Sequence, residues 1–342
     1  MHQFLSGIQQ IGIGVCDAEK AKHTYKHLFG MDVLIFDDEA KASLMTQYTG
    51  GQEFNRRAIL TMNLQGGGGF ELWQFLDRVP SKVNTVKLGD IGIFAAIIKS
   101  ADIYKSHQRL SNISGLNTSK LNSCESGLHY FYVTDSQDNT FKIVPSDDWF
   151  QKDKHDLGGV IGAVIGVSNI EKSIEFYQTI LGLDTVLYDI KINENNHNFR
   201  KVGLHKSATG KGAFNKLLGN VTIELIQNLD QQAPKIYRNR YWGDCGFIHL
   251  CFDVIAMDDL KTHVQSRGLD FTVDSNNTFS MDNASGRFCY IEDPDCTLIE
   301  LVETHRVPIL KKMGWYLDLR KRNQEKPLSK WMIKMLALSK VK

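Results

Sequence analysis

The stretch from Ile11 to Tyr25, IGIGVCDAEKAKHTY, returns in altered form from Ala163 to Tyr177, AVIGVSNIEKSIEFY. Matching residues lie 152 positions apart, and further along Phe70–Leu72 returns as Ile223–Leu225 at an offset of 153. A nearly constant offset over this length indicates an internal duplication. We place the boundary in the polar stretch of residues 146–156.

Each half divides again into two similar units. Residues 8–15 have the pattern of a strand, residues 18–29 have helical spacing that ends before Gly30, and three more strands are expected at 33–37, 58–63 and 70–75. The glycine run at 66–69 indicates the turn before the last of these strands. The second unit has a strand at 91–98, a helix at 101–110 and strands at 130–134 and 140–144. The second half repeats the scheme, with expected elements at 248–254, 257–268, 288–291 and 298–302.

The chain is therefore predicted to have an α+β fold of four βαβββ modules. We divide it into a domain at 1–150, a second domain at 151–307 and a basic helical tail at 308–342. Hydrophobic residues make up 42% of the 342 positions, a share typical of globular proteins. No apolar run reaches the roughly 20 residues that cross a bilayer, and no secretion signal is apparent. The six cysteines form no CxxC pair, so we expect reduced thiols and a cytoplasmic location.

The repeated units resemble modules of the vicinal oxygen chelate superfamily, which includes glyoxalase I, extradiol dioxygenases and bleomycin and fosfomycin resistance proteins. The resemblance rests on a strand ending in Val-x-Asp/Asn, followed by Glu-Lys-Ser-x-x-Phe-Tyr and Leu-Gly, and on the closing sequence from Asp293 to Leu301. It covers roughly residues 5–305 and is strongest in the third and fourth modules. It implies that modules pair into two cup-shaped mixed sheets, and that each module offers one metal ligand from its first strand and one from its last.

Transferred to this chain, the resemblance implies different ligand sets in different modules. Module one offers Gln10 and Glu71, and module four offers His249 and Glu300. Module three offers only Glu224, because Gly162 occupies its first position. Module two places Ile93 and Lys142 there, and neither is a metal ligand.

The superfamily uses two ways of pairing modules, and the sequence leaves both open. If neighbours pair, Glu224, His249 and Glu300 would share a cup. If module one pairs with four and two with three, then Gln10, Glu71, His249 and Glu300 converge, a set that resembles the zinc site of animal-type glyoxalase I. In that arrangement the second cup would be inactive, and Lys142 would pair with Glu224.

The first interpretation of function is a metal-dependent lyase or isomerase of the glyoxalase type, with Glu71 or Glu300 as catalytic base. The positions that hold glutathione in the family carry Gly14 and Cys245, so we expect a different small, oxygen-rich substrate. A ring-cleaving dioxygenase and a non-catalytic, resistance-type binding protein are the alternatives. The cofactor is expected to be a divalent metal, and zinc, nickel, manganese and iron all suit the ligands. No residue is assigned to an organic cofactor.

The tail is basic, whereas the rest of the chain is mildly acidic. Residues 311–342 contain ten Lys or Arg against two acidic residues. Helical spacing places Trp331, Met335 and Leu338 on one face, with Met332 and Leu336 beside them. We expect this helix to cap its own body or a partner chain rather than to lie on a membrane. No nucleic-acid partner is expected, and a homo-oligomer stays open.

Overall fold

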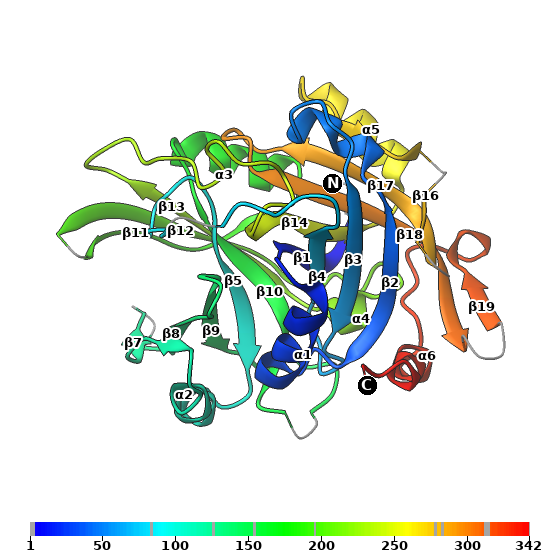
Figure 1. The fold of residues 1–342 in the computed structure, drawn as a ribbon, viewed down its shortest axis with the longest axis horizontal. Coiled ribbons are helices and arrows are strands. Elements are labelled where there is room, and N and C mark those ends of the chain that lie inside the picture. The colour runs from blue at the N-terminus through cyan, green and yellow to red at the C-terminus, as the bar shows by residue number, and fades with distance from the viewer. Residues whose placement is uncertain are drawn as a thin grey trace.

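The protein consists of two curled mixed β-sheets that lie side by side (Figure 1). The computed structural model describes residues 4–82, 85–124, 127–152, 155–194, 196–276, 279–281, 284–310 and 315–341. The predicted α+β class is confirmed. In the described residues, no helix is long and apolar enough to cross a membrane.

One sheet, here called cup 1, combines the beginning of the chain with its last third. Its strands run in the order β15-β17-β18-β14-β1-β4-β3-β2, while β16 and β19 pair with β17 and β18. Cup 1 therefore unites modules one and four. We call the pairing of module one with four and of module two with three the crossed arrangement. Its strands are β1 (Leu5–Gly14), β2 (Val33–Lys41), β3 (Asn55–Met62), β4 (Gly69–Phe75), β14 (Gly246–Val254), β15 (Val273–Asp274), β16 (Phe279–Met281), β17 (Ala284–Glu292), β18 (Leu298–Leu310) and β19 (Trp315–Asp318).

The other sheet, cup 2, is formed by the middle of the chain. Its order is β11-β12-β13-β10-β5-β9-β8-β6, with β7 beside β8, so modules two and three pair. The division of the chain at residues 150 and 307 stays a prediction, because strand pairing alone does not test it. The strands of cup 2 are β5 (Gly92–Ser100), β6 (Asn117–Thr118), β7 (Asn122–Ser123), β8 (His129–Thr134), β9 (Thr140–Pro145), β10 (Leu157–Gly166), β11 (Thr185–Glu194), β12 (His197–Lys206) and β13 (Val221–Asn228).

Four module helices pack into a core that both sheets share. They are α1 (Ala18–Phe29), α2 (Ile103–Ser111), α3 (Ile170–Thr179) and α5 (Met257–Ser266). Capping explains where α1 begins and ends: the Asp17 side chain accepts a hydrogen bond from the Lys20 amide, and Gly30 is left-handed with φ of 67°. The core includes the fully buried rings of Tyr25 and Tyr177, the two tyrosines that end the repeated stretch.

These two tyrosines also link neighbouring modules. Tyr25 Oη donates a hydrogen bond of 2.7 Å to Asp135 in module two, and Tyr177 Oη donates one of 3.1 Å to Asp293 in module four. The backbone at Gly67 adds another contact between the cups, because a Cβ there would lie 2.7 Å from the carbonyl carbon of Gly159. The glycine run thus forms the turn between β3 and β4, as predicted, and also lets the two sheets approach closely.

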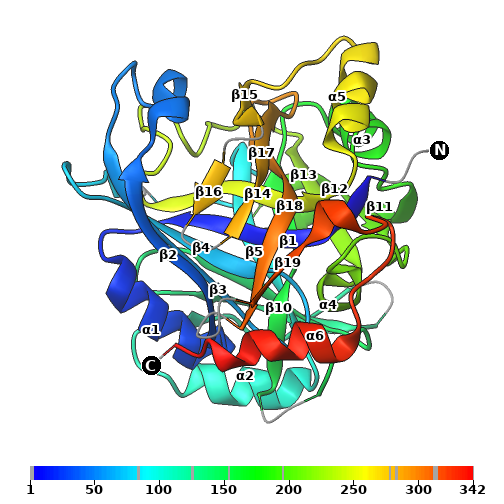
Figure 2. The ribbon, with the colours of Figure 1, turned by 90° about the vertical axis from the view of Figure 1, so that its right-hand side faces the viewer.

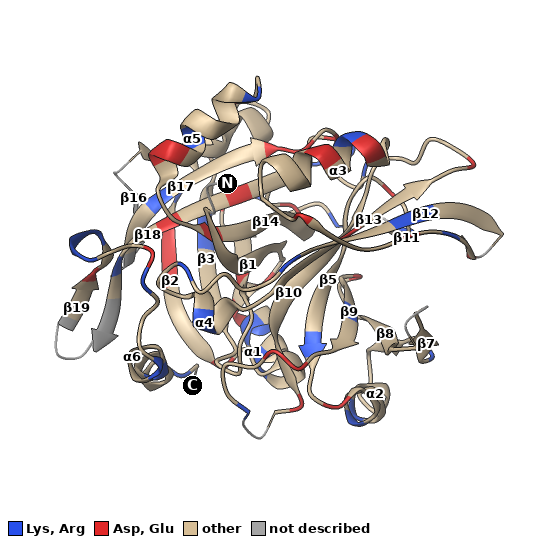
Figure 3. Cartoon of the chain, turned by 180° about the vertical axis from the view of Figure 1, so that it is seen from behind, with Lys and Arg blue, Asp and Glu red and all other residues tan. Residues whose placement is uncertain are grey.

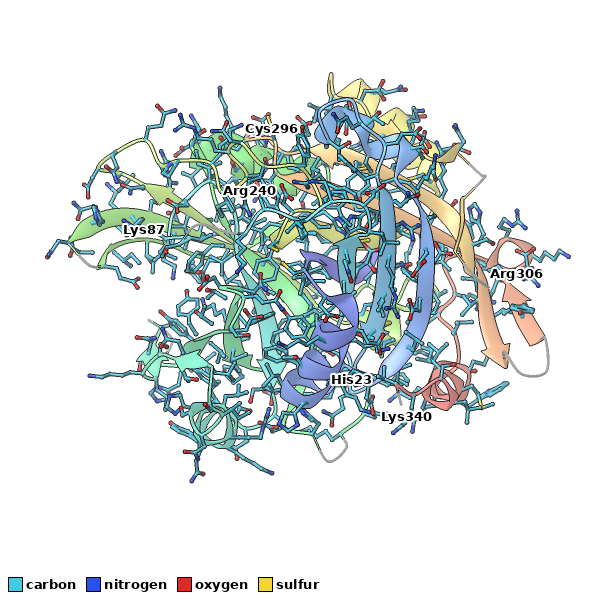
Figure 4. All side chains as sticks on the ribbon, in the orientation of Figure 1. His23, Lys87, Arg240, Cys296, Arg306 and Lys340 are labelled. Atoms are coloured by element: carbon cyan, nitrogen blue, oxygen red, sulfur yellow. The ribbon has the colours of Figure 1, made fainter. Side chains whose placement is uncertain are left out.

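The tail packs on its own body. It contains η4 (Leu319–Lys321), α6 (Lys330–Lys334) and η5 (Met335–Leu338), and Figure 3 colours the basic positions of α6 blue. Leu328, Ile333 and Leu336 are buried against residues of β2 and of the segment after β3, whereas Trp331 and Leu338 are exposed. The predicted apolar face is therefore only partly buried: Leu336 is buried and Met332 and Met335 pack beside it, while Ile333 takes the place expected for Trp331 and Leu338. Backbone bonds of residues 339 and 341 to residues 34 and 32 hold the end of the tail against β2. Lys340, labelled in Figure 4, pairs with Asp32 at 3.3 Å. The predicted tail residues 311–314 and 342 lie outside the described residues.

Candidate metal centre

Four polar side chains meet on the concave face of cup 1. Gln10 comes from β1, Glu71 from β4, His249 from β14 and Glu300 from β18, which are four adjacent strands in the sheet. All four residues are buried, and His249 is fully so. The crossed pairing therefore brings together the four residues that the family resemblance assigns to modules one and four.

The donor atoms lie close to one another. His249 Nε2 is 3.2 Å from Glu71 Oε2 and 3.1 Å from Glu300 Oε2. The Gln10 amide donates hydrogen bonds to the same two carboxylate oxygens, at 3.1 and 3.2 Å. Among the described residues, Glu71, His249 and Glu300 are the cluster with metal-binding spacing.

These spacings fit a single divalent ion. Ligand bonds of roughly 2.0–2.2 Å place neighbouring donors on one ion about 3.0–3.5 Å apart. His249 Nε2 lies near both carboxylates, yet it lacks a hydrogen-bond partner of acceptable geometry in the described structure, as does Gln10 Oε1. Because amide oxygen and nitrogen can exchange places by a simple flip, Gln10 could turn its oxygen toward an ion. The residues present therefore fit a metal with three or four protein ligands.

The charges of the cluster also favour a cation. Burial alone would lower the pKa of His249, but the carboxylates of Glu300 and Glu71 raise it to about 9. Burial raises the pKa of Glu71, and the charge of Glu300 adds to that effect. Burial would also raise the pKa of Glu300, but the neighbouring His249 lowers it. Two buried carboxylates attract a proton or a metal ion to the same place, so metal binding would release protons.

Two aromatic residues orient His249. Tyr290 Oη lies 3.2 Å from His249 Nδ1, which leaves Nε2 to face the carboxylates. The Trp242 ring is nearly parallel to the imidazole, at 18° and 6.1 Å between centroids. Sequence analysis missed both residues. The sequence did contain a signal for Tyr290. Asp293 begins the turn that joins β17 to β18, and counting back from this turn places Tyr290 on β17 directly opposite Glu300. Trp242 lies in the segment before β14, and no sequence pattern pointed to it.

The cluster opens into a cavity of about 360 Å³. Gln10, Glu71 and Glu300 line the cavity, whereas His249 closes it from behind. An ion held by these residues would have one side open to a small molecule, which is typical of catalytic rather than structural metal sites.

Cup 2 has no such cluster among its described residues. Glu224 lies on β13 of cup 2 and is not brought together with His249 and Glu300. Lys142 Nζ lies 2.6 Å from one Glu224 oxygen, and Lys201 Nζ lies 3.2 Å from the other. The expected pairing of Lys142 with Glu224 in the crossed arrangement is confirmed.

The first-strand position in module two needs a correction. Lys142 pairs with Ile97 in the same way that Glu300 pairs with Cys251, so the equivalent of His249, two residues earlier, is Ala95 and not Ile93. Ala95 packs with the apolar residues on the concave side of cup 2, whereas Ile93 lies in the shared core. The prediction placed this first-strand position two residues too early, because module two shares few residues with the other modules.

Comparison with known proteins supports the fold. Residues 163–290 match the model of the glyoxalase/bleomycin resistance protein/dioxygenase superfamily. The predicted superfamily resemblance is confirmed. No curated protein sequence matches the chain.

Solved structures resemble the chain over most of its length. Glyoxalase I from Zea mays is 13% identical with a TM-score of 0.53, covering 87% of this chain and 92% of that chain. A candidate dioxygenase from Bacillus subtilis subsp. subtilis str. 168 is 12% identical with a TM-score of 0.56, covering 88% and 86%. At these identities the likeness establishes the shared fold and leaves the reaction to be argued from the site.

Proposed function

We propose that the protein is a metal-dependent lyase or isomerase of the glyoxalase type, with its active centre in cup 1. The observation that carries the proposal is the convergence of Gln10, Glu71, His249 and Glu300 on one side of a cavity. A glutamine, two glutamates and a histidine differ from the two histidines and one carboxylate that the resemblance implies for a ring-cleaving dioxygenase.

The residues of the cluster would have different roles in such a reaction. A bound divalent ion would polarise a substrate oxygen and so acidify the neighbouring C–H bond. Glu71 or Glu300 would accept that proton at a carboxylate oxygen and return it to an adjacent atom, which is general acid–base catalysis. Tyr290 fixes the orientation of His249, and the apolar walls around the cluster limit the access of water.

The structure around the cluster also favours a substrate other than a glutathione adduct. Gly14 offers no side chain, and a Cβ there would meet the Asp244 carbonyl oxygen at 2.0 Å. Cys245 faces Cys16 at 3.3 Å. Neither position supplies the basic side chain that the family resemblance associates with glutathione, so we propose a different small molecule with neighbouring oxygen atoms.

Elemental analysis of the purified protein tests the proposal. We expect about one zinc, nickel, manganese or iron ion per chain after reconstitution. His249→Ala and Glu71→Ala should each remove it, whereas Glu224→Gln, a buried carboxylate outside cup 1, should retain it. Retention of metal by His249→Ala would overturn the assignment of the site. Absence of metal in every protein, together with tight ligand binding and no turnover, would favour a resistance-type binding protein.

A further inference from the structure

The cavity of cup 1 extends well beyond the candidate metal ligands. Along β18 the residues that line it alternate, from Glu300 through Val302 and Thr304 to Arg306. Six residues of strand correspond to about 20 Å. The cavity therefore runs along the strands, from the ligand cluster at one end to the rim near β19, where Figure 4 labels Arg306.

The walls of this extension are mainly apolar and come from distant parts of the chain. Leu34 of β2 and Met62 of β3 face it from one side, and Val302 faces it from the other. Leu217 and Leu218 of α4 (Asn215–Leu218) form another part of its wall. The packing of the tail against β2, seen in Figure 2 with α6 in front of the sheet, adds Leu336 to the lining.

The charged residues near the cavity are largely engaged elsewhere. Arg56 Nη1 lies 2.7 Å from Asp38 and its guanidinium stacks over the Trp73 ring. The Arg306 guanidinium stacks at 4.0 Å over Tyr316 at the exposed rim. Between the ligand cluster and the rim, the cavity thus offers mainly apolar surface for carbon chains and rings, and two of its polar side chains, Gln9 and Thr304, bond to each other at 3.4 Å.

We propose that cup 1 takes an elongated substrate with two neighbouring oxygen atoms at one end and an apolar chain or ring system at the other. The oxygens would lie at the Glu71, His249 and Glu300 cluster, and the apolar part would run between Val302 and Leu34 toward Leu336. A volume of about 360 Å³ falls within the range of small-molecule sites, roughly 300–1,000 Å³. This inference rests on the proposed function for the oxygen end only, because the apolar extension is present without an ion.

Hydroxamates test the two ends together, since they offer two neighbouring oxygens to a metal and can carry chains of any length. We expect octanohydroxamate to bind the zinc-reconstituted protein at least about 100-fold more tightly than acetohydroxamate, since each buried methylene contributes about four-fold. Val302→Asp should abolish most of that gain. Val186→Asp is the matched control, because Val186 is an exposed valine on β11 of cup 2 and should leave the gain intact.

A second titration separates this inference from the proposed function. Octanamide and acetamide are titrated into EDTA-treated protein, where no metal contributes. Octanamide should still bind more tightly to the wild type than to Val302→Asp, with the thermal midpoint, and the metal content before EDTA treatment, checking that the variant is folded. Equal affinity for long and short ligands in both titrations would overturn the inference, even if the metal site is real. Chain-length dependence in EDTA-treated protein, together with a wild type that takes up no metal on reconstitution, would support the inference and refute the metal-dependent function.

Discussion

Lys142 Nζ lies 2.6 Å from Glu224 Oε2, at the place in cup 2 that corresponds to the Glu300 and Glu71 pair of cup 1. A fixed ammonium group on β9 thus occupies the position where cup 1 has a second carboxylate. Lys201 Nζ at 3.2 Å and the hydroxyl of Tyr188 complete the surroundings of Glu224. Cup 2 balances its buried carboxylate with two lysines, whereas the two carboxylates of cup 1 share the single imidazole of His249, which is the difference that our proposed ion would exploit.

This difference predicts unequal effects of substitutions in cup 2. Glu224→Gln should lower the free energy of unfolding by about 3–5 kcal/mol, because it leaves two buried ammonium groups without their counter-charge. Lys142→Met should cost roughly half as much, since Lys201 still neutralises Glu224. Urea unfolding at neutral pH measures both values. A larger loss for Lys142→Met than for Glu224→Gln would contradict this account.

The same carboxylate predicts a pH dependence of stability. Burial acts to raise the pKa of Glu224, but the charges of Lys142 and Lys201 lower it to about 2 in the folded protein. Against the ordinary value of 4.5, this corresponds to about 3 kcal/mol of stability, present above pH 4.5 and lost as the pH falls from 4.5 toward 2. The stability difference between wild type and Glu224→Gln, measured by urea unfolding at pH 5.5 and pH 3, should therefore shrink at the lower pH. A difference that stays constant between these two pH values would argue against ionised Glu224.

Tyr290 should tune the metal affinity of cup 1 without being a ligand. Its hydroxyl lies 3.2 Å from His249 Nδ1, so Tyr290→Phe removes the group that fixes the imidazole while keeping the ring. Loss of such a supporting hydrogen bond typically weakens metal binding about 10–100-fold. Competition with a fluorescent zinc chelator measures the change. Tyr188→Phe, which removes the equivalent type of contact in cup 2, should leave zinc affinity unchanged.

The sequence predicted the modules well because each carries its own local signals. The helix at 18–29 was correct to the residue, since Asp17 and Gly30 cap it through contacts within its own turns. Pairing of modules depends on which edge strands meet, and β1 meets β14 more than 200 residues later. No local signal encodes that choice, so both arrangements stayed open until the structure showed the crossed one.

The candidate site was predictable because the family resemblance assigns one ligand position to the first strand and one to the last strand of each module. Glu71, His249 and Glu300 occupy such positions, and the structure brings them together. Trp242 and Leu336 belong to segments outside the modules, and they reach cup 1 only through tertiary packing. The cavity walls, and with them the substrate preference, therefore could not be derived from the repeat.

Cys16 and Cys245 give the last prediction. Their sulfur atoms lie 3.3 Å apart although the residues are 229 positions apart in the chain, and Cys16 is exposed. Hydrogen peroxide should oxidise the two thiols to a disulfide, with loss of both thiol protons and reduction of the peroxide to two waters. The number of titratable thiols in the denatured protein should fall from six to four, and mass spectrometry should detect a peptide pair joining these residues. Cys16→Ser should prevent the crosslink, whereas Cys296→Ser, which removes the other exposed cysteine, should not. A crosslink that forms equally well in Cys16→Ser would show that other cysteines react and that this contact is not the oxidised pair.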